Sequence, residues 1–333
     1  ILRRSTRCRT GPSLPGRSCR RYGRNGKTNK PLPGRVRDQG TVSDSPWGAL
    51  NITNTTAMNV SEAQLYYFSP THTSKRVGEA VAAGLQAARL VENDLTHTPA
   101  DDAILPSSSV AVVAVPVYRG SVAPLALERL QGLHGDGTPV VLLAVYGNRD
   151  YEHALDDLDR FMTERGFVTV AAGAFVGEHS YSTPQTPVAA GRPDVADLQL
   201  ARRFGEKVRD KLAGYEPGRF VRLEVARIPR PELSWLDKLR FVWYGLGLKV
   251  LKKPMPVAPV TDPGQCNGCG VCAIVCPTGA IAAGNELHTD ASRCIRCCAC
   301  VKSCRRTARS FDTPFAKILT ACCARPKQPH VLL

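Results

Sequence analysis

The 333-residue chain is long enough for about two domains, each able to bury a hydrophobic core. Its formal net charge of +15 lies mostly in residues 1–40, where 12 Lys and Arg oppose one acid, which gives +11 and leaves +4 elsewhere. This distribution argues against nucleic-acid binding by the folded body, and no apolar run reaches the roughly 20 residues of a transmembrane helix.

Residues 1–60 are rich in Arg, Gly, Pro, Ser and Thr and show little apolar periodicity. Such a segment buries too little surface to offset its ordering entropy, so we predict disorder. A basic nucleic-acid arm and a transit peptide are alternatives, although the segment has no amphipathic apolar face. Because the chain begins with Ile, a fragment or an incorrectly chosen start is also compatible with this segment.

Residues 61–214 are predicted to alternate between strands and helices. A strand at 64–68 is followed by a helix at 75–85, where Val77, Val81 and Leu85 share one face. The further predicted elements are strands at 90–95, 110–115, 140–145 and 167–174 and helices at 125–133, 151–164 and 194–212. Unbroken Val, Ala and Leu strands between helices indicate a parallel sheet covered on both faces. Ligands of such sheets bind beyond the carboxyl ends of the strands.

Polar loops follow these strands at the expected ligand-binding edge. Residues 69–74, Ser-Pro-Thr-His-Thr-Ser, lie between a strand and a helix, where hydroxyls and backbone N–H groups can bind an anion. An ordinary helix cap is the alternative interpretation of this loop. No Lys follows a glycine-rich loop here, so a nucleoside triphosphate is disfavoured. The other polar loops are at 117–120, 146–149 and 177–182.

Residues 215–262 form a Pro-rich linker that contains one predicted amphipathic helix. Trp235, Leu236, Leu239 and Trp243 share a face of this helix. We expect this face to dock the two domains together, and attachment to a membrane surface is the alternative.

Nine of the 13 cysteines lie between 266 and 304, which favours metal-bound thiolates in a reducing compartment. Two runs have the same spacing, C-x2-C-x2-C-x3-C, and are separated by 17 residues. In runs of this bacterial type, the fourth Cys ligates the other cluster. The predicted ligands of one [4Fe-4S] cluster are Cys266, Cys269, Cys272 and Cys304, and those of the second are Cys294, Cys297, Cys300 and Cys276. Disulfides and structural zinc are the alternatives, although zinc sites usually separate two CxxC pairs more widely.

The second run departs from the first at two places. Pro277 follows Cys276, whereas Arg305 follows Cys304, and the absence of Pro is expected to loosen this turn. Cys298 is an extra thiol, for which we prefer a bystander over an alternative ligand or an oxidation-sensitive site. The C-terminal tail, 311–333, holds two further cysteines without the spacing of a third cluster.

Residues 64–212 resemble a flavodoxin, on the evidence of the loop Phe68-Ser-Pro-Thr-His-Thr-Ser74. The resemblance implies FMN, whose phosphate would bind Ser69, Thr71, Thr73 and Ser74. It also implies that loops on either side flank the flavin ring, with residues Val117, Tyr118, Arg119, Gly120, Gly147, Asn148 and Arg149. Tyr118 is expected to stack on the ring, with a packed rim aromatic as the alternative. His72 stands where this loop usually has Gly, so it either tolerates a positive φ and adds a donor, or marks a domain that has lost its flavin.

Residues 263–310 resemble a two-cluster bacterial ferredoxin, and the order of the two parts resembles that of flavodoxin–ferredoxin fusion proteins. The implied fold is a flavodoxin-like doubly wound parallel sheet of five strands, in order 2-1-3-4-5, with a small α+β ferredoxin-like two-cluster domain. Members of this family are mostly uncharacterised electron carriers.

We therefore expect a cytoplasmic electron carrier that relays electrons between FMN, two [4Fe-4S] clusters and redox partner proteins. Arg296, Lys302, Arg305, Arg306 and Arg309 would suit an acidic redox partner. One alternative is an FMN-dependent reductase of a small substrate, with His179, Glu178 or Tyr151 as proton donor. The other is a cluster-based redox sensor that uses Cys298 and the basic N-terminal segment.

Overall fold

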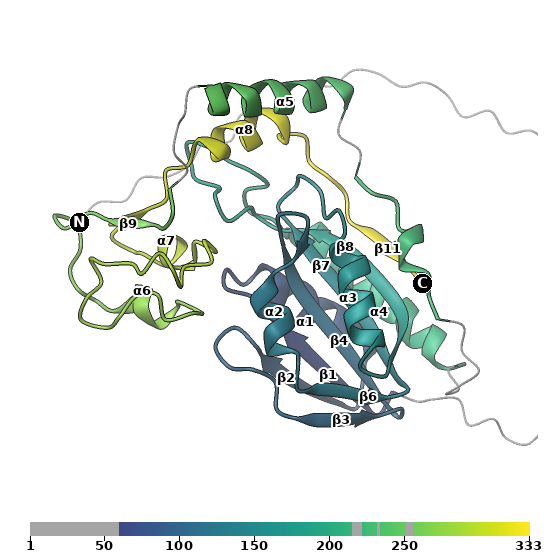
Figure 1. The fold of residues 1–333 in the computed structure, drawn as a ribbon. Helices are drawn as coiled ribbons and strands as arrows, with labels where there is room; N and C mark the ends of the chain where they lie inside the picture. The colour runs from purple at the N-terminus through teal and green to yellow at the C-terminus, as the bar shows by residue number, and fades with distance from the viewer. Residues whose placement is uncertain (1–59, 215–221, 232–233, 251–255) are drawn as a thin grey trace, which may run out of the picture. The chain divides into compact units, whose positions relative to one another are not determined.

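The computed structural model describes residues 60–214, 222–231, 234–250 and 256–333. The predicted disordered segment, apart from Val60, lies outside the described residues, as do residues 215–221, 232–233 and 251–255 of the linker. The described chain is an α/β structure followed by a small cysteine-rich segment (Figure 1).

Five parallel strands form the centre of the main sheet (Figure 1). Their spatial order is β2 (Arg89–Asp94), β1 (Glu62–Tyr67), β4 (Ser109–Tyr118), β7 (Thr138–Tyr146) and β8 (Phe167–Val176). This is the predicted order 2-1-3-4-5, and it confirms the fold class. β7 is buried throughout and β4 along its first eight residues, as expected for Val- and Ala-rich strands covered on both faces.

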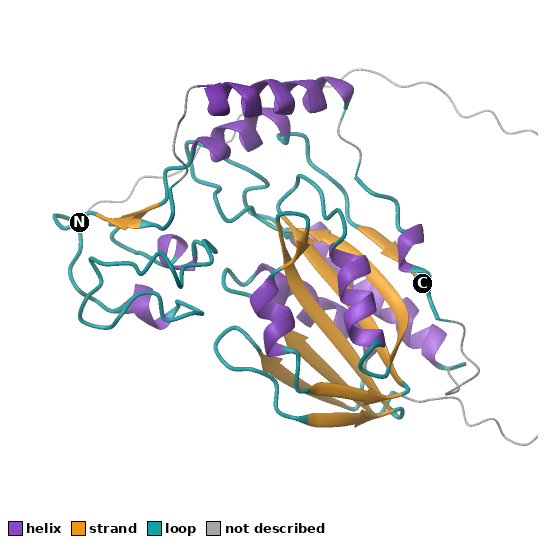
Figure 2. Ribbon diagram, viewed as in Figure 1, coloured by secondary structure: helices purple, strands orange, loops and turns teal. Residues whose placement is uncertain are grey.

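Helices cover both faces of this sheet (Figure 2). On one face lie α1 (Thr73–Leu85) and α4 (Val195–Leu212), whose apolar residues share a core with the strands. On the other face lie α2 (Pro124–Arg129) and α3 (Ala154–Thr163). The helices α1 and α4 approach closely because both contribute a glycine, and a Cβ on Gly84 or Gly205 would collide with the backbone of the other helix.

The sheet also contains two antiparallel strands that the sequence did not predict. β5 (Ser121–Val122) pairs with β4, and β11 (His330–Leu332) pairs with β8, so the predicted C-terminal tail returns to the sheet. A separate parallel pair joins β3 (Ala103–Pro106) to β6 (Leu133–Asp136). The expected helix at 125–133 is therefore shorter than predicted.

The linker helix and the tail form a helical pair. Helix α5 (Trp235–Val250) packs on α8 (Pro314–Cys322), and the rings of Phe241 and Phe315 lie 6.0 Å apart. The expected docking face is wrong, because Trp235 and Trp243 are 72% and 74% exposed. The opposite side of α5 faces inward instead, with Asp237 buried. A 3-10 turn, η1 (Val225–Arg227), precedes α5.

The cysteine-rich segment has a two-fold repeated backbone. β9 (Val260–Thr261) pairs antiparallel with β10 (Arg309–Ser310), and each Cys run contains one short helix, α6 (Val271–Ile274) or α7 (Ala299–Lys302). The residue before each helix is left-handed: Gly270 has φ 75° and Cys298 has φ 58°. The turns that end the runs also match, since Gly279 N donates to Cys276 O and Thr307 N donates to Cys304 O. The second turn is therefore closed without proline, contrary to the expected loosening.

Candidate functional site: two cysteine sets beside a cavity

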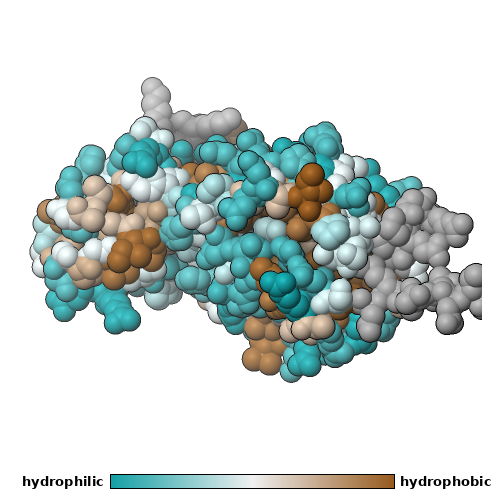
Figure 3. Space-filling model, turned by 90° about the horizontal axis from the view of Figure 1, so that it is seen from below, coloured by the Kyte–Doolittle hydropathy of each residue, from teal (hydrophilic) through white to brown (hydrophobic). Residues whose placement is uncertain are grey.

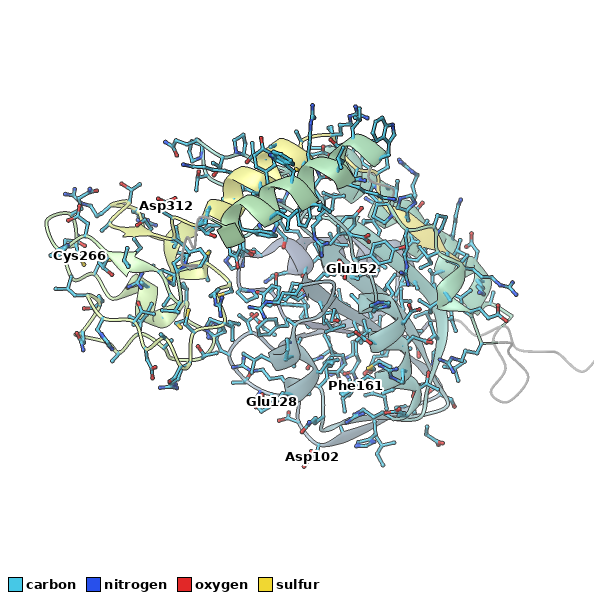
Figure 4. All side chains as sticks on the ribbon, turned by 45° about the horizontal axis from the view of Figure 1, so that its top comes forward. Asp102, Glu128, Glu152, Phe161, Cys266 and Asp312 are labelled. Carbon is cyan, nitrogen blue, oxygen red and sulfur yellow. The ribbon has the colours of Figure 1, made fainter. Side chains whose placement is uncertain are left out.

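The eight cysteines of the two runs form two sets, each around its own small cavity. The first cavity is lined by Cys266, Cys269, Cys272 and Cys304. The second is lined by Cys276, Cys294, Cys297 and Cys300, and also by Cys298, the extra thiol outside the repeated spacing. The fourth Cys of each run thus lines the cavity of the other run. The role of these eight thiols as cluster ligands stays a prediction. Cys266 lies in the loop labelled in Figure 4.

The geometry of these sets disfavours the two alternative interpretations. The cysteines that the structure describes are all free, so none of them forms a disulfide. Among the described residues, no three His, Cys, Asp or Glu side chains converge closely enough to hold a single metal ion. Four thiolates around a four-iron cube stand farther apart than four around one zinc ion, where each Zn–S bond is about 2.3 Å. The sets therefore fit a cluster better than zinc.

Burial disfavours charge on the thiols of the second set. It raises the pKa of Cys297 to about 12 and that of Cys300 to about 11, so both are neutral thiols without a metal. A bound metal centre would supply the positive charge that ionises them. Ala280 N donates to the sulfur of Cys276 at 3.2 Å, which is the kind of contact that stabilises a thiolate.

Arg309 is buried between the two sets, which corrects its expected place on the surface. It is 3% exposed, and its Nη1 donates to the carbonyl of Glu286 at 2.8 Å. Burial raises the pKa of Cys272 and of Cys300, and the charge and hydrogen bonds of Arg309 lower both. One buried cation therefore contacts a cysteine of each set. The sequence does not indicate this role, because Arg309 lies five residues after Cys304 and outside the Cys motif.

A cavity of about 730 Å³ lies at the carboxyl ends of β1, β4, β7 and β8. Ten of the twelve residues predicted to bind FMN line it, namely Ser69, Thr71, Thr73, Ser74, Val117, Tyr118, Arg119, Gly120, Gly147 and Arg149. His72 and Asn148 are not among its lining residues. Four loops that are far apart in sequence thus meet at the edge where a doubly wound sheet binds ligands.

The loop before α1 has the form of an anion site. Ser69 O accepts from His72 N at 3.0 Å, and Ser69 Oγ accepts from Lys75 N at 3.0 Å. Ser74 Oγ is fully buried and has no hydrogen-bond partner in the described structure. A phosphate at the positive end of α1 would accept a hydrogen bond from this hydroxyl, so these residues fit the FMN phosphate.

The two predicted residues outside the cavity wall have structural roles. His72 precedes α1 with φ 63°, so this position does require the left-handed backbone for which flavodoxins use Gly. Asn148 is buried and binds the C-terminal segment: its Nδ2 donates to Cys323 O and Arg325 O, and its Oδ1 accepts from Lys327 N. The side chain of Asn148 therefore fixes the tail, which sequence alone did not indicate.

The middle of the cavity is lined by aromatic side chains and a neutral histidine. The hydroxyl of Tyr146 is buried without a partner in the described structure, so it is available to a ligand. His179 Nδ1 accepts from Tyr181 N at 3.0 Å, which leaves the proton of a neutral ring on Nε2. Loss of hydration, with the charges of Lys302 and Arg149, lowers the pKa of His179 to about 4.

Glycines and an ion pair shape the loops around this cavity. A Cβ on Gly147 would collide with the ring of His179, and one on Gly120 would collide with the carboxylate of Glu152. Glu152, labelled in Figure 4, pairs with Arg149 at 2.5 Å. The close approach of these side chains requires glycine at both positions.

The wall of this cavity continues into the second cysteine set. Cys294 and Ile295 line both the large cavity and the small cavity of that set. Ile295 also packs against the apolar core of the sheet. Burial raises the pKa of Tyr118 well above its ordinary value, and Cys297 and Cys298 raise it further, which places Tyr118 near these thiols. The sequence does not indicate Cys294, Ile295 and Arg296 as wall residues, because no local pattern links them to loops more than 100 residues earlier.

Polar and aromatic contacts join this set to the sheet on two sides. Arg129 Nη2 donates to Pro277 O at 2.6 Å, next to Cys276. Lys302 Nζ lies 2.6 Å from Glu178 Oε1. The rings of Tyr181 and Phe311 lie 5.1 Å apart.

Comparison with known families and structures agrees with the cysteine chemistry. The 4Fe-4S binding domain family matches residues 259–282, which contain the first Cys run. A search of curated proteins gave no match. The strand order of the sheet is that of a flavodoxin-type fold, and the family match indicates a ferredoxin-type 4Fe-4S binding domain. The chain therefore combines the two.

Solved structures similar to the chain include flavodoxins. A flavodoxin from the domain Archaea is 14% identical, with 45% of this chain and 98% of that chain covered and a TM-score of 0.32. A flavodoxin from Streptococcus pneumonia TIGR4 is 19% identical, with 45% and 99% covered and a TM-score of 0.32. The Flv1 flavodiiron core from Synechocystis sp. PCC6803 is 13% identical, with 47% and 37% covered and a TM-score of 0.35, so the chain spans about a third of that protein.

No helix among the described residues is both long enough and apolar enough to cross a membrane.

Proposed function

We propose that this chain is an iron–sulfur flavoprotein electron carrier of the flavodoxin–ferredoxin fusion type. It relays electrons between FMN, two [4Fe-4S] clusters and redox partner proteins in a reducing, cytoplasmic environment. The observation that carries the proposal is the shared wall, since Cys294 and Ile295 line both the large cavity and the cavity of the second cysteine set. A flavin site and a cluster site that share a wall need no further carrier between them.

The residues divide into three groups with different roles. The hydroxyls of Ser69, Thr71, Thr73 and Ser74 bind the FMN phosphate, and the loops at 117–120 and 147–149 enclose the flavin ring. The eight run cysteines hold the clusters. FMN, when bound, exchanges two electrons with one partner and single electrons with another, and each cluster carries one electron. The corresponding domains are 61–214 and 263–310, joined by the linker at 215–262.

The two cysteine sets have an inner and an outer position. The second set borders the cavity, and three residues close to its cysteines in sequence, Pro277, Ile295 and Lys302, contact the α/β part of the chain. The first set contains Cys269, which is exposed, and Arg306, also exposed, lines its cavity. We therefore assign the second set as the inner site and the first as the outer site, where an acidic partner would bind near Arg305 and Arg306.

Two of the three proton donors of the alternative reductase function are already engaged. The third, His179, keeps a proton on Nε2, but it is a neutral ring with its pKa lowered to about 4 and therefore not an imidazolium acid at neutral pH. Burial raises the pKa of Glu178, but hydrogen bonds from Lys302 and Gly191 lower it overall, so Glu178 is an anion. The hydroxyl of Tyr151 donates to Pro229 O at 3.0 Å. These contacts favour a carrier over proton-coupled reduction of a substrate.

Anaerobic purification tests this function directly. We expect about eight iron per chain and one FMN. Cys269→Ala should remove about half of the iron, and the remaining inner cluster should still be reduced through FMN. In Cys297→Ala, the remaining outer cluster should no longer be reduced through FMN. Cys322→Ala, a buried thiol outside both runs, is the matched control. Fewer than four iron per chain, or reduction that survives in Cys297→Ala, would contradict the proposal.

A further inference from the structure

Helix α5 presents a continuous apolar stripe to solvent. The stripe consists of Trp235, Leu236, Leu239, Val242, Trp243 and Leu246, all of them exposed. At about 100° per residue, these positions fall within a sector roughly 120° wide between Trp235 and Leu246. On the face drawn in Figure 3, hydrophobic residues lie instead in small groups among hydrophilic ones. A contiguous stripe of this kind marks an interaction site.

The stripe is not needed to attach α5 to the fold. The opposite side of the helix already packs on α8, where Phe241 meets Phe315 edge to face. Asp237 on this inner side is buried and accepts from the hydroxyl of Ser234 at 2.7 Å. Figure 1 shows α5 along the outside of α8. The outer stripe therefore stays free while the helix remains docked.

The charges around the stripe are almost all positive. Lys238 and Arg240 are exposed, and each lies about 40° from one edge of the stripe. Among the described side chains of α5, the one other charged group is Asp237, which is buried and lies 3.7 Å from Arg240 Nη1. Apolar and aromatic side chains flanked by Lys and Arg are the features of a helix that lies in the interface of an anionic membrane.

The length of α5 suits this position. Its 16 residues extend for about 24 Å, which is shorter than the roughly 30 Å hydrocarbon core. Tryptophan indoles prefer the headgroup level, and the exposed stripe carries two of them, Trp235 and Trp243. A second copy of the chain fits less well, because two facing stripes would bring their flanking cations together.

We propose that α5 docks the protein on an anionic membrane surface. The helix lies parallel to the membrane, with the indoles of Trp235 and Trp243 in the interface and Lys238 and Arg240 among the lipid headgroups. Docking on this helix leaves the folded body at the membrane surface.

Co-sedimentation with vesicles of phosphatidylcholine and phosphatidylserine tests the proposal on the full chain. We expect the wild type to bind, and Trp235→Glu/Leu239→Glu/Trp243→Glu to bind at least about tenfold more weakly, since each stripe residue loses its apolar burial. Ile104→Glu is the matched control, because Ile104 is 73% exposed but lies on β3. Circular dichroism establishes that the variants are folded.

Tryptophan emission separates the helix from the basic segment at 1–40. The chain has three Trp, so Trp47→Phe leaves only the two in α5. Their emission should shift to the blue on vesicle binding. Part of this shift should remain when salt screens the basic segment and the cations of α5, because burial of the indoles does not depend on charge. Equal binding by the wild type and the triple variant would assign binding to the basic segment and overturn the proposal. Two further results would overturn the proposal. One is a dimer that forms without vesicles and is lost in the triple variant. The other is binding to a protein that depends on the stripe, with no binding to vesicles.

Discussion

Lys302 Nζ lies 2.6 Å from Glu178 Oε1, so the end of α7 forms an ion pair with the loop after β8. The side chains are 26% and 29% exposed, and Lys302 also reaches Ser182 O at 3.4 Å. Lys302 is two residues from Cys300, and Glu178 lines the large cavity. The pair therefore holds the inner cysteine set against the wall of the proposed flavin site.

Lys302→Met should slow electron transfer more than it destabilises the fold. A partly exposed pair contributes roughly 0–1 kcal/mol to the free energy of unfolding, so the urea midpoint should change little. Looser docking of the inner site should slow cluster reduction several-fold in anaerobic stopped-flow absorbance of the reconstituted protein.

Charge exchange provides the control for this pair. Lys302→Glu/Glu178→Lys should recover most of the rate, and Arg160→Met, which breaks an exposed pair with Asp157, should leave it unchanged. The stabilisation that the Lys302–Glu178 ion pair gives to the folded protein should be complete at pH values above the ordinary pKa of a Glu carboxyl. It should be lost as the pH falls through the lowered pKa of Glu178. An unchanged rate in Lys302→Met would show that the pair does not position the inner site.

Cys298→Gly should leave both clusters in place with little change in stability. Cys298 occupies the position of Gly270 in the first run, and Arg296, with φ 57°, occupies that of Gly268, with φ 66°. Glycine relieves a left-handed backbone by about 1 kcal/mol, but the loss of a side chain that is only 2% exposed offsets this gain. We expect a similar urea midpoint and unchanged iron content.

The same substitution at a run cysteine provides the contrast. Cys300→Gly should lose about half of the iron, because Cys300 belongs to the repeated Cys spacing, whereas Cys298 lines the same small cavity from outside that spacing. Loss of iron in Cys298→Gly would instead identify Cys298 as an alternative ligand.

The sequence predicted the fold because the fold depends on local patterns: the buried Val and Ala runs of β4 and β7 specify parallel strands. The repeated Cys spacing indicated eight thiols that line two cavities, although Cys298, outside this spacing, also lines the second. Their role as cluster ligands stays a prediction. The hydroxyl loop at 69–74 was also recognisable, since its residues adjoin one helix N-terminus.

What the sequence did not predict depends on contacts between distant segments. Strand β11 has only three residues, and its partner β8 is some 150 residues earlier. Asn148 sits in a loop typical of ligand binding, yet its amide binds the tail. For α5, periodicity identified an apolar face correctly but could not tell which face packs, because both sides carry aromatic residues.

Arg309→Met should lower the reduction potentials of both clusters. The buried guanidinium stabilises the reduced state of each cluster, which is the more negative state. A unit charge in contact with the cluster ligands shifts a reduction potential by roughly 50–150 mV. Loss of the bond to Glu286 O should also cost about 1–3 kcal/mol of stability. Redox titration followed by EPR measures both potentials.

Two substitutions separate charge from structure at this site. Arg309→Lys keeps the charge and should restore most of the potential. Arg306→Met removes an exposed cation that lines only the outer cavity. It should therefore lower the reduction potential of the outer cluster alone, and by less than Arg309→Met does. Potentials that stay unchanged in Arg309→Met would contradict the central position of this arginine.

His72→Gly should stabilise the chain without weakening FMN binding. His72 has φ 63° and ψ 2° and makes no side-chain hydrogen bond that caps α1, so glycine removes strain of about 1 kcal/mol. The cavity wall does not include His72, and the FMN affinity measured by fluorescence quenching should therefore stay the same. Lys75→Gly, within α1, should destabilise the chain by about 1 kcal/mol. This variant is the control for the effect of glycine at a position with an ordinary helical backbone. A clear loss of FMN affinity in His72→Gly would show instead that this imidazole donates to the phosphate.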